Sequence, residues 1–276
     1  MPENSPAPSS ASSIAVLAVN VGNTNTAFEV FMPSGVEGAR ARVSIPNANA
    51  PEVIDGLIEA SGALDGVEAS AIVFASTNKP VLDALVEQLR ARTDHEVYVL
   101  GVDLAIPIRF DLAPEQMTGQ DRFLNALAAY QSMQQACIVV DAGTAMTVDF
   151  VDGEGVFQGG AIMPGFGMAV RTLHEKTSAL PEAGMSPLPD DQPFGKNTDQ
   201  AIRLGVASML RGGVRALAER YAMAYEAYPP IVVTGGDAKL LFGDDELIDR
   251  IVPNLTLLGI RIACERALGV AEDDDE

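Results

Sequence analysis

The feature that most constrains this chain is a short pattern that occurs twice along it. In each copy an apolar run ends in a polar residue, and a glycine with a small polar neighbour follows. The copies are Leu17-Ala18-Val19-Asn20-Val21-Gly22-Asn23-Thr24 and Ile138-Val139-Val140-Asp141-Ala142-Gly143-Thr144-Ala145. Because glycine has no Cβ, the backbone N–H groups of such a turn can approach an anion closely. The repeat therefore predicts two similar halves, each with a strand that leads into an anion-binding turn.

The two copies differ at one position, where Asn20 is equivalent to Asp141. A carboxylate without a partner is costly at the end of a buried strand, so we expect Asp141 to coordinate a cation or accept several hydrogen bonds. Either turn by itself is more often a tight hairpin than a phosphate site. The matched pair, with hydroxyls on Thr24 and Thr144, favours a polyphosphate held between two lobes.

Three further segments carry candidate chemistry. Thr234-Gly235-Gly236 follows an apolar strand and would let a nucleoside approach, although a plain strand-to-helix turn has the same composition. Asp121 and Arg122 open a helix, where a first-turn carboxylate also interacts favourably with the helix dipole. Their functional interpretation is a base beside a cationic anchor, as phosphorylation of a hydroxyl on an anionic substrate requires. Thr198 lies in an ordinary helix-cap region.

Apolar periodicity predicts alternating strands and helices, and so a parallel or mixed sheet covered by helices. We expect a disordered tail at 1–13, a first lobe at 14–118, a second lobe at 119–270 and an acidic tail at 271–276. Residues 44–51 read as a linker, residues 180–193 as an exposed loop, and Gly212-Gly213 as an interruption of a long helix. The predicted strands lie near 14–20, 26–32, 71–75, 97–100 and 231–234, with a strand, turn and strand over 138–150. The predicted helices lie near 53–61, 81–92, 121–131, 197–221 and 257–268.

The formal net charge of −20 opposes binding to nucleic acid or to anionic membranes. No apolar run approaches the roughly 20 residues that span a bilayer. Residues 1–13 contain no Lys or Arg, which argues against a signal or transit peptide. Cys137 and Cys264 lack metal or redox spacing and are expected to be buried free thiols in a cytoplasmic protein. His95 and His174 are expected to be structural.

Taken in order, these motifs resemble the type III pantothenate kinases, within the superfamily of acetate and sugar kinases, heat-shock ATPases and actin. The resemblance runs from about Ile14 to Leu268. The segments that carry it are 20–26, 119–122, 141–145, 159–165, 197–198 and 234–236. It implies an α/β fold of two RNase-H-like (actin-like ATPase) lobes with an ATP cleft between them, and a homodimer. The implied activity is ATP-dependent phosphorylation of pantothenate to 4′-phosphopantothenate, the first step of coenzyme A biosynthesis.

The resemblance also implies roles for individual residues. Asp121 would be the catalytic base, and Asp141 would help to hold a monovalent cation, K⁺ or NH₄⁺, while Mg²⁺ accompanies ATP. The implied ATP-binding residues are Asn20, Val21, Gly22, Asn23, Thr24, Asn25, Thr26, Ala27 and Thr144. The implied pantothenate-binding residues are Phe110, Gly119, Gln120, Asp121, Arg122 and Thr198, of which Thr198 is expected near the dimer interface.

The chain departs from the family pattern at three positions. Asn20 replaces an aspartate, Phe110 stands where a tyrosine is frequent, and Glu29 stands where a glycine is frequent. An amide cannot supply negative charge to a magnesium shell, although it can donate to a phosphate oxygen. Two alternatives therefore stay open: a catalytically weakened, nucleotide-binding regulatory or accessory protein, and a kinase of another small polar alcohol.

Overall fold

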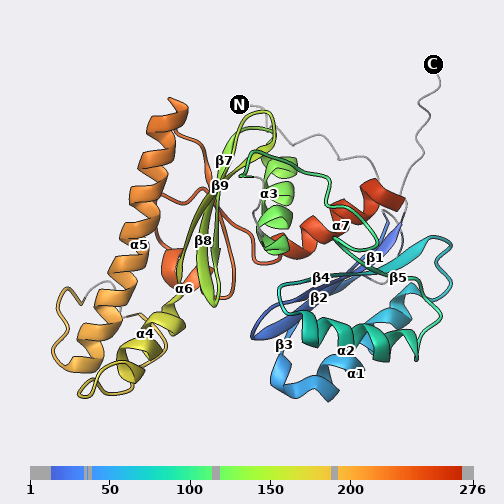
Figure 1. Ribbon diagram of the computed structural model, residues 1–276, viewed down its shortest axis with the longest axis horizontal. Helices are drawn as coiled ribbons and strands as arrows, with labels where there is room; N and C mark the ends of the chain where they lie inside the picture. The colour runs from blue at the N-terminus through green and yellow to red at the C-terminus, as the bar shows by residue number, and fades with distance from the viewer. Residues whose placement is uncertain (1–13, 34–35, 37–38, 114–118, 188–191, 269–276) are drawn as a thin grey trace. The chain divides into compact units, whose positions relative to one another are not determined.

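The computed structural model describes residues 14–33, 36, 39–113, 119–187 and 192–268. The expected tails at 1–13 and 271–276, and Thr118 before the Asp121 helix, lie outside these residues. The chain forms two compact units (Figure 1). The first comprises Met1–Pro107 and Leu257–Glu276, and the second comprises Ile108–Thr256.

The first unit contains a five-stranded sheet in the order β3-β2-β1-β4-β5. Strand β1 is antiparallel to β2 and parallel to β4. Helices α1 (Ala50–Ser61) and α2 (Lys79–Arg90) pack their apolar sides on one face of this sheet. The strands are β1 (Ala15–Val21), β2 (Asn25–Phe31), β3 (Arg40–Pro46), β4 (Ser70–Ser76) and β5 (Val97–Val99).

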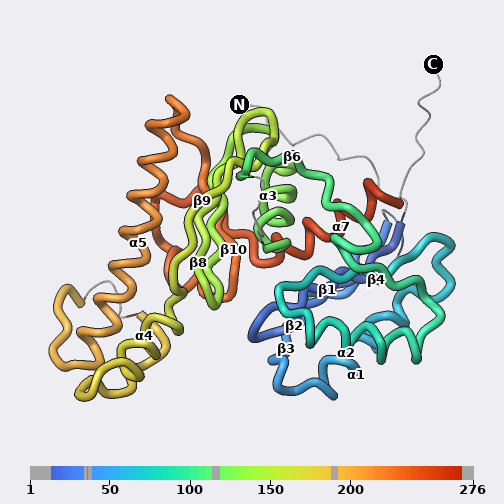
Figure 2. The backbone as a smooth tube through the Cα atoms, viewed as in Figure 1, coloured from blue at the N-terminus to red at the C-terminus, as the bar shows by residue number. Residues whose placement is uncertain are grey.

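The second unit contains a six-stranded sheet in the order β11-β10-β7-β8-β9-β6. Its α5 side buries an apolar cluster that includes Ile138, Val140 and Leu210, while α3 contacts β7 and β8 (Figure 2). The strands are β6 (Arg109–Phe110), β7 (Cys137–Ala142), β8 (Ala145–Val151), β9 (Val156–Pro164), β10 (Ile231–Thr234) and β11 (Arg250–Ile251). The helices are α3 (Gln120–Met133), α4 (Phe166–Glu175), α5 (Thr198–Tyr225), α6 (Ala238–Phe242) and the start of α7 (Leu255–Leu268).

The two sheets repeat one topology. The order β9-β8-β7-β10-β11 matches β3-β2-β1-β4-β5, and β7, like β1, is antiparallel to the next strand and parallel to the later one. Asn20 pairs with Ala27 and Ala75, and Asp141 pairs with Thr147 and Thr234 at the matching places. The predicted duplication and the fold class are confirmed.

Several local expectations were wrong. Residues 44–46 are not a linker, because they complete β3, where Ile45 is buried opposite Thr26. Strand β9 was not predicted, because its sequence contains Gly159 and Gly160. The predicted interruption at Gly212-Gly213 was also wrong, since helix α5 continues through both residues. The two compact units divide at 107/108 and 256/257, whereas the sequence predicts a lobe boundary at 118/119. One reason is that α7 packs with the first unit, where Arg261 lies 5.5 Å from the Phe31 ring.

Candidate functional site

The second glycine turn lies at the end of β7, where three of the predicted motifs meet. The N–H of Gly143 donates to the carbonyl of Ala145 (3.2 Å), and the N–H of Asp237 donates to the carbonyl of Ala142 (2.9 Å). A Cβ on Gly165 would lie 2.0 Å from the Gly143 oxygen, and one on Gly235 would lie 2.4 Å from the Ala142 oxygen. These contacts are possible only for glycine, so the turn is built by backbone packed on backbone.

The first glycine turn joins β1 to β2 and is one residue longer, because Val21 pairs with Thr26 whereas Ala142 pairs with Met146. Asn47 supports this turn: its Nδ2 donates to the Gly22 carbonyl (2.8 Å), and its Oδ1 accepts from the Thr26 hydroxyl (2.8 Å). Sequence reasoning missed Asn47 because it fell in the presumed linker.

Helix α3 begins with the predicted base. Gly119 is its N-cap residue, and the Asp121 carboxylate accepts a hydrogen bond from the backbone N–H of Arg122 (2.9 Å). Burial raises the pKa of the Asp121 carboxyl above its ordinary 3.8, against the opposing effects of that N–H and of the Arg122 charge. A carboxylate whose proton affinity is raised by its surroundings suits general base catalysis.

Arg122 is clamped by Asp149, a residue that sequence reasoning did not select. The Arg122 Nε lies 3.1 Å from each Asp149 carboxylate oxygen, and its Nη2 also donates to Oδ1. Both side chains are largely buried, at 12% and 2% exposure. Desolvation alone would lower the pKa of Arg122, but the hydrogen bonds and charge of Asp149 outweigh it and raise that pKa. The guanidinium is therefore held charged.

Aromatic rings continue from Arg122 toward Phe110. The Phe157 ring centre lies 5.4 Å from the Arg122 Cζ and 5.1 Å from the Phe123 ring centre. Phe123 in turn lies 5.4 Å from Phe110, which pairs with Phe157 between β6 and β9 and is 59% exposed. The structure thus brings Phe110 into the same neighbourhood as Asp121 and Arg122.

Buried Asn125 connects the base helix to the cation candidate. Its Nδ2 donates to Oδ2 of Asp141 (3.0 Å), and its Oδ1 accepts from the Thr256 hydroxyl (2.8 Å). Asn125 lies one helical turn after Asp121 on the same side of α3. The four-residue spacing was the only sequence signal for Asn125, and its partner could not be deduced.

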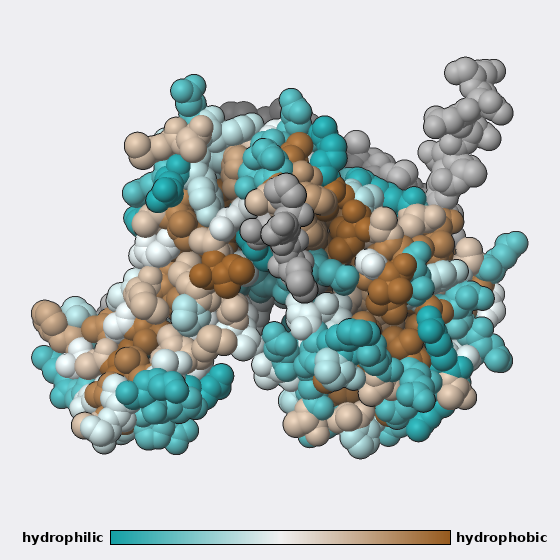
Figure 3. All heavy atoms as spheres, in the orientation of Figure 1, coloured by the Kyte–Doolittle hydropathy of each residue, from teal (hydrophilic) through white to brown (hydrophobic). Residues whose placement is uncertain are grey.

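Thr198 is not brought to Asp121 within one chain. It begins α5, whereas the Tyr221 hydroxyl near the other end of that helix bonds the Val148 carbonyl beside Asp149 (3.1 Å). Their separation of 23 positions corresponds to about 34 Å of helix. Thr198 instead borders a shallow apolar hollow between α4 and α5, in the region where Figure 3 shows apolar side chains at the surface.

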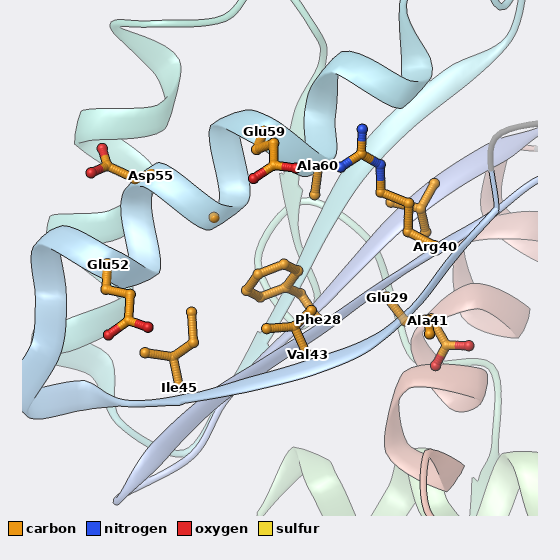
Figure 4. Close-up of a pocket in the computed structure, with 12 residues that line it drawn as sticks. Phe28, Glu29, Arg40, Ala41, Val43, Ile45, Glu52, Asp55, Glu59 and Ala60 are labelled. Carbon is orange, nitrogen blue, oxygen red and sulfur yellow. Dashed lines mark hydrogen bonds and ion pairs between the residues drawn. The ribbon is translucent and has the colours of Figure 1, made fainter.

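Another hollow lies in the first unit, between α1 and strands β2 and β3 (Figure 4). Its floor includes Phe28 and Ile45, and Glu52, Asp55 and Glu59 stand around it. None of the predicted site residues lines it. Glu29, two residues beyond Ala27 on β2, lies on the same face of the sheet as Asn20, because Ala18 pairs with Glu29 and Asn20 with Ala27.

Other site classes find little support in the described part of the chain. No group of three or more His, Cys, Asp or Glu residues there could hold a metal ion, and no helix there is long and apolar enough to cross a membrane. Cys137 and Cys264 are buried free thiols, as predicted, and burial raises the pKa of each to about 12. His95 bonds Asp65 (3.0 Å) and His174 bonds the Leu180 carbonyl (2.8 Å).

A duplicated sheet with a glycine turn after the first strand of each copy defines an actin-like ATPase fold of the kind that small-molecule kinases use. The family model for type III pantothenate kinase matches residues 16–220. The chain therefore belongs to the type III pantothenate kinase family.

Relatives named type III pantothenate kinase agree with this assignment. Those from Anaeromyxobacter sp. (strain K) and Moorella thermoacetica are each 33% identical over 256 residues, which cover 91% of this chain and 99% of the relative. Two solved structures share the fold. A Campylobacter jejuni protein described as a Baf family transcriptional activator has a TM-score of 0.54 at 19% identity, covering 91% of this chain and 98% of its own. A Sinorhizobium meliloti protein described as a 2-dehydro-3-deoxygalactonokinase has 0.53 at 14%, covering 95% and 99%.

Proposed function

We propose that this chain transfers the γ-phosphoryl group of ATP to the 4′-hydroxyl of pantothenate, the first step of coenzyme A biosynthesis. Family membership gives the reaction class. The observation that carries the chemical assignment is the pair that opens α3, a buried carboxylate with a raised pKa beside a clamped cation. A cytoplasmic location is part of this proposal, because ATP is the donor.

In this scheme Asp121 accepts the hydroxyl proton while the substrate oxygen forms a bond to the γ-phosphorus in line with the departing ADP. The γ-phosphorus bond to the bridging oxygen breaks, and ADP leaves with that electron pair. Arg122 binds the pantothenate carboxylate, which places the hydroxyl near Asp121. Phe110, Gly119 and Gln120 complete the pantothenate contacts.

Both glycine turns take part in ATP binding in this proposal. Residues 20–27 would wrap the phosphates and Thr144 would donate to them, as Gly-containing turns allow an anion to approach closely. Contact of both turns with one nucleotide remains a prediction.

In the described part of the chain no group of three or more His, Cys, Asp or Glu residues could hold a metal ion, so the cation assigned here depends on a single carboxylate. Asp141 offers a carboxylate near the end of strand β7, positioned by the Asn125 amide. Such oxygen donors match hard cations. We assign K⁺ or NH₄⁺ to Asp141, with Mg²⁺ arriving on ATP; when bound, these ions neutralise phosphate charge. Asn20 adds no charge to a magnesium shell.

The separation of Thr198 from Asp121 supports a homodimer. If α5 packs antiparallel against its copy, the midpoint between Thr198 and Tyr221 falls at Met209, which is 51% exposed. Gly205 and Gly212 flank that midpoint with open space around them, so two helices can approach closely. Thr198 of the partner subunit would then lie near Tyr221, beside the Arg122–Asp149 pair.

Light scattering after size-exclusion chromatography tests this assignment, and a monomer at assay concentration contradicts it.

A coupled ADP-release assay with pantothenate, Mg²⁺ and K⁺ tests the reaction, with Asp121→Asn as the matched inactive variant. We expect turnover in the wild type and its loss in the variant. Near-normal turnover by Asp121→Asn would remove Asp121 from the base role.

Asn20 is an amide and its neighbours in the sheet are Ala27 and Ala75, so two other results of this assay are considered. ATP binding without turnover would indicate a regulatory or accessory protein. Turnover only with other small alcohols would indicate a related kinase.

A further inference from the structure

The reaction scheme leaves one buried charge without a role, the carboxylate of Asp149. It lies on β8, its side chain is 2% exposed, and it makes its ion pair with Arg122. We infer that Asp149 is a positioning residue that fixes the Arg122 guanidinium as the receptor for the substrate's carboxylate, and so sets the preference for an anionic over a neutral substrate. This inference rests on the proposed function and adds a determinant of substrate specificity.

The ion pair with Asp149 leaves the Nη1 group of Arg122 available to bind a substrate. Nε and Nη2 donate to Asp149, so one edge of the planar guanidinium is occupied. No hydrogen bond from Nη1 to any described residue is present. A guanidinium presents five N–H donors in a fixed plane. Clamping one edge therefore orients the remaining donors toward a second carboxylate.

Residues of β8 and β9 surround the Asp149 carboxylate. Thr147, two residues away on the same face of β8, lowers the pKa of the Asp149 carboxyl, although burial raises that pKa overall. Gly160 pairs with Asp149 across the β8–β9 ladder, and a Cβ there would lie 2.4 Å from the Asp149 Oδ1. The atom nearest to such a Cβ is the Val148 carbonyl oxygen, at 2.2 Å, so the glycine leaves room both for the β8 backbone and for the Asp149 carboxylate. On another side, the Phe157 ring lies against the guanidinium, so Arg122 is held from two directions.

The ion pair between Arg122 and Asp149 also balances charge near Asp121, the proposed base. Arg122 and Asp149 each interact electrostatically with Asp121 and with Tyr221. With Asp149 ionised, the Arg122–Asp149 pair is neutral as a whole. Without Asp149, an unbalanced buried cation would stand beside Asp121, and a buried charge that loses its partner is strongly unfavourable. Replacing both charges together avoids that penalty and gives a cleaner test.

The test compares pantothenate with the analogue in which a CH₂OH group replaces the carboxylate. The measured quantity is the ratio of kcat/KM for the two substrates in wild type, Asp149→Asn, Arg122→Met and the double variant. A charge-assisted hydrogen bond contributes enough for about a 10- to 100-fold change. We expect Asp149→Asn to lower the ratio by about that factor, mainly through the KM for pantothenate. The double variant should match Arg122→Met.

The outcomes separate the possibilities. A wild-type ratio retained in folded Asp149→Asn overturns the inference. A ratio that differs between the double variant and Arg122→Met also overturns it, because Asp149 would then act by a route other than Arg122. That second comparison decides the matter if Asp149→Asn does not fold, as judged by circular dichroism and thermal melting. A wild type that phosphorylates neither substrate contradicts the proposed function itself.

Discussion

Gly165→Ala is the change that most directly tests whether the Gly143-Thr144 turn binds phosphate. Gly165 precedes α4 with φ −71° and ψ 172°, a backbone conformation that alanine adopts freely. Its added Cβ would nevertheless lie 2.0 Å from the Gly143 oxygen and 2.7 Å from the Thr144 oxygen. Any effect must therefore come from the clash with the turn and not from strain at position 165.

The size of the effect follows from that contact. A Cβ contact becomes ordinary at 3.4 Å, so the turn and position 165 must separate by about 1.4 Å. Because the contacted atoms are backbone, no side-chain rotation relieves the clash. Overpacking of this kind costs about 1–3 kcal/mol of stability. A displacement of about 1 Å at a phosphoryl-transfer site can cost about 100-fold in rate.

The assay is the coupled ADP-release reaction, with KM measured separately for ATP and for pantothenate. Gly167→Ala is the matched control, because its Cβ would meet nothing closer than 3.8 Å and alanine favours the α4 helix. We expect Gly165→Ala to lose about 100-fold in kcat/KM for ATP while Gly167→Ala keeps wild-type kinetics. Wild-type ATP kinetics in a folded Gly165→Ala protein would refute the assignment of this turn to phosphate binding.

Three other predictions follow from the same geometry. Burial raises the folded-state pKa of Asp121, so Asp121→Asn should be more stable than wild type at neutral pH. That advantage should shrink as pH falls through the raised pKa and vanish below 3.8; thermal melts across pH that show a constant difference would contradict it. Asn20→Asp should increase kcat in the presence of Mg²⁺, and an unchanged or lower kcat would show that the amide does not limit turnover. Gly212→Ala should stabilise α5 by about 0.5–1 kcal/mol in urea unfolding under conditions where the chain is monomeric, because nothing within the chain lies near its new Cβ. Gly213→Ala should gain less, because the Met163 sulfur lies 3.3 Å away; equal gains would contradict this reasoning.

The sequence alone determined the duplicated architecture and the candidate residues that the proposed reaction uses. A strand and the turn that follows it are local structures, so their apolar run, polar end and glycine are readable from a few consecutive residues. For the same reason Asn20, Asp141 and the α3 start could be selected without knowing what surrounds them. The family resemblance then supplied the expected roles of these residues, with which their local chemistry is compatible.

Only the tertiary structure decided which residues meet. Asp149 follows Arg122 by 27 positions and Asn47 follows Gly22 by 25, and nothing in either separation predicts a contact. Sheet pairing and helix packing set these distances, so Asp149 became the partner of Arg122 while Thr198 lay a whole helix length from Tyr221. Long-range pairing depends on the packing of the entire unit, and a pattern along the chain does not contain that information.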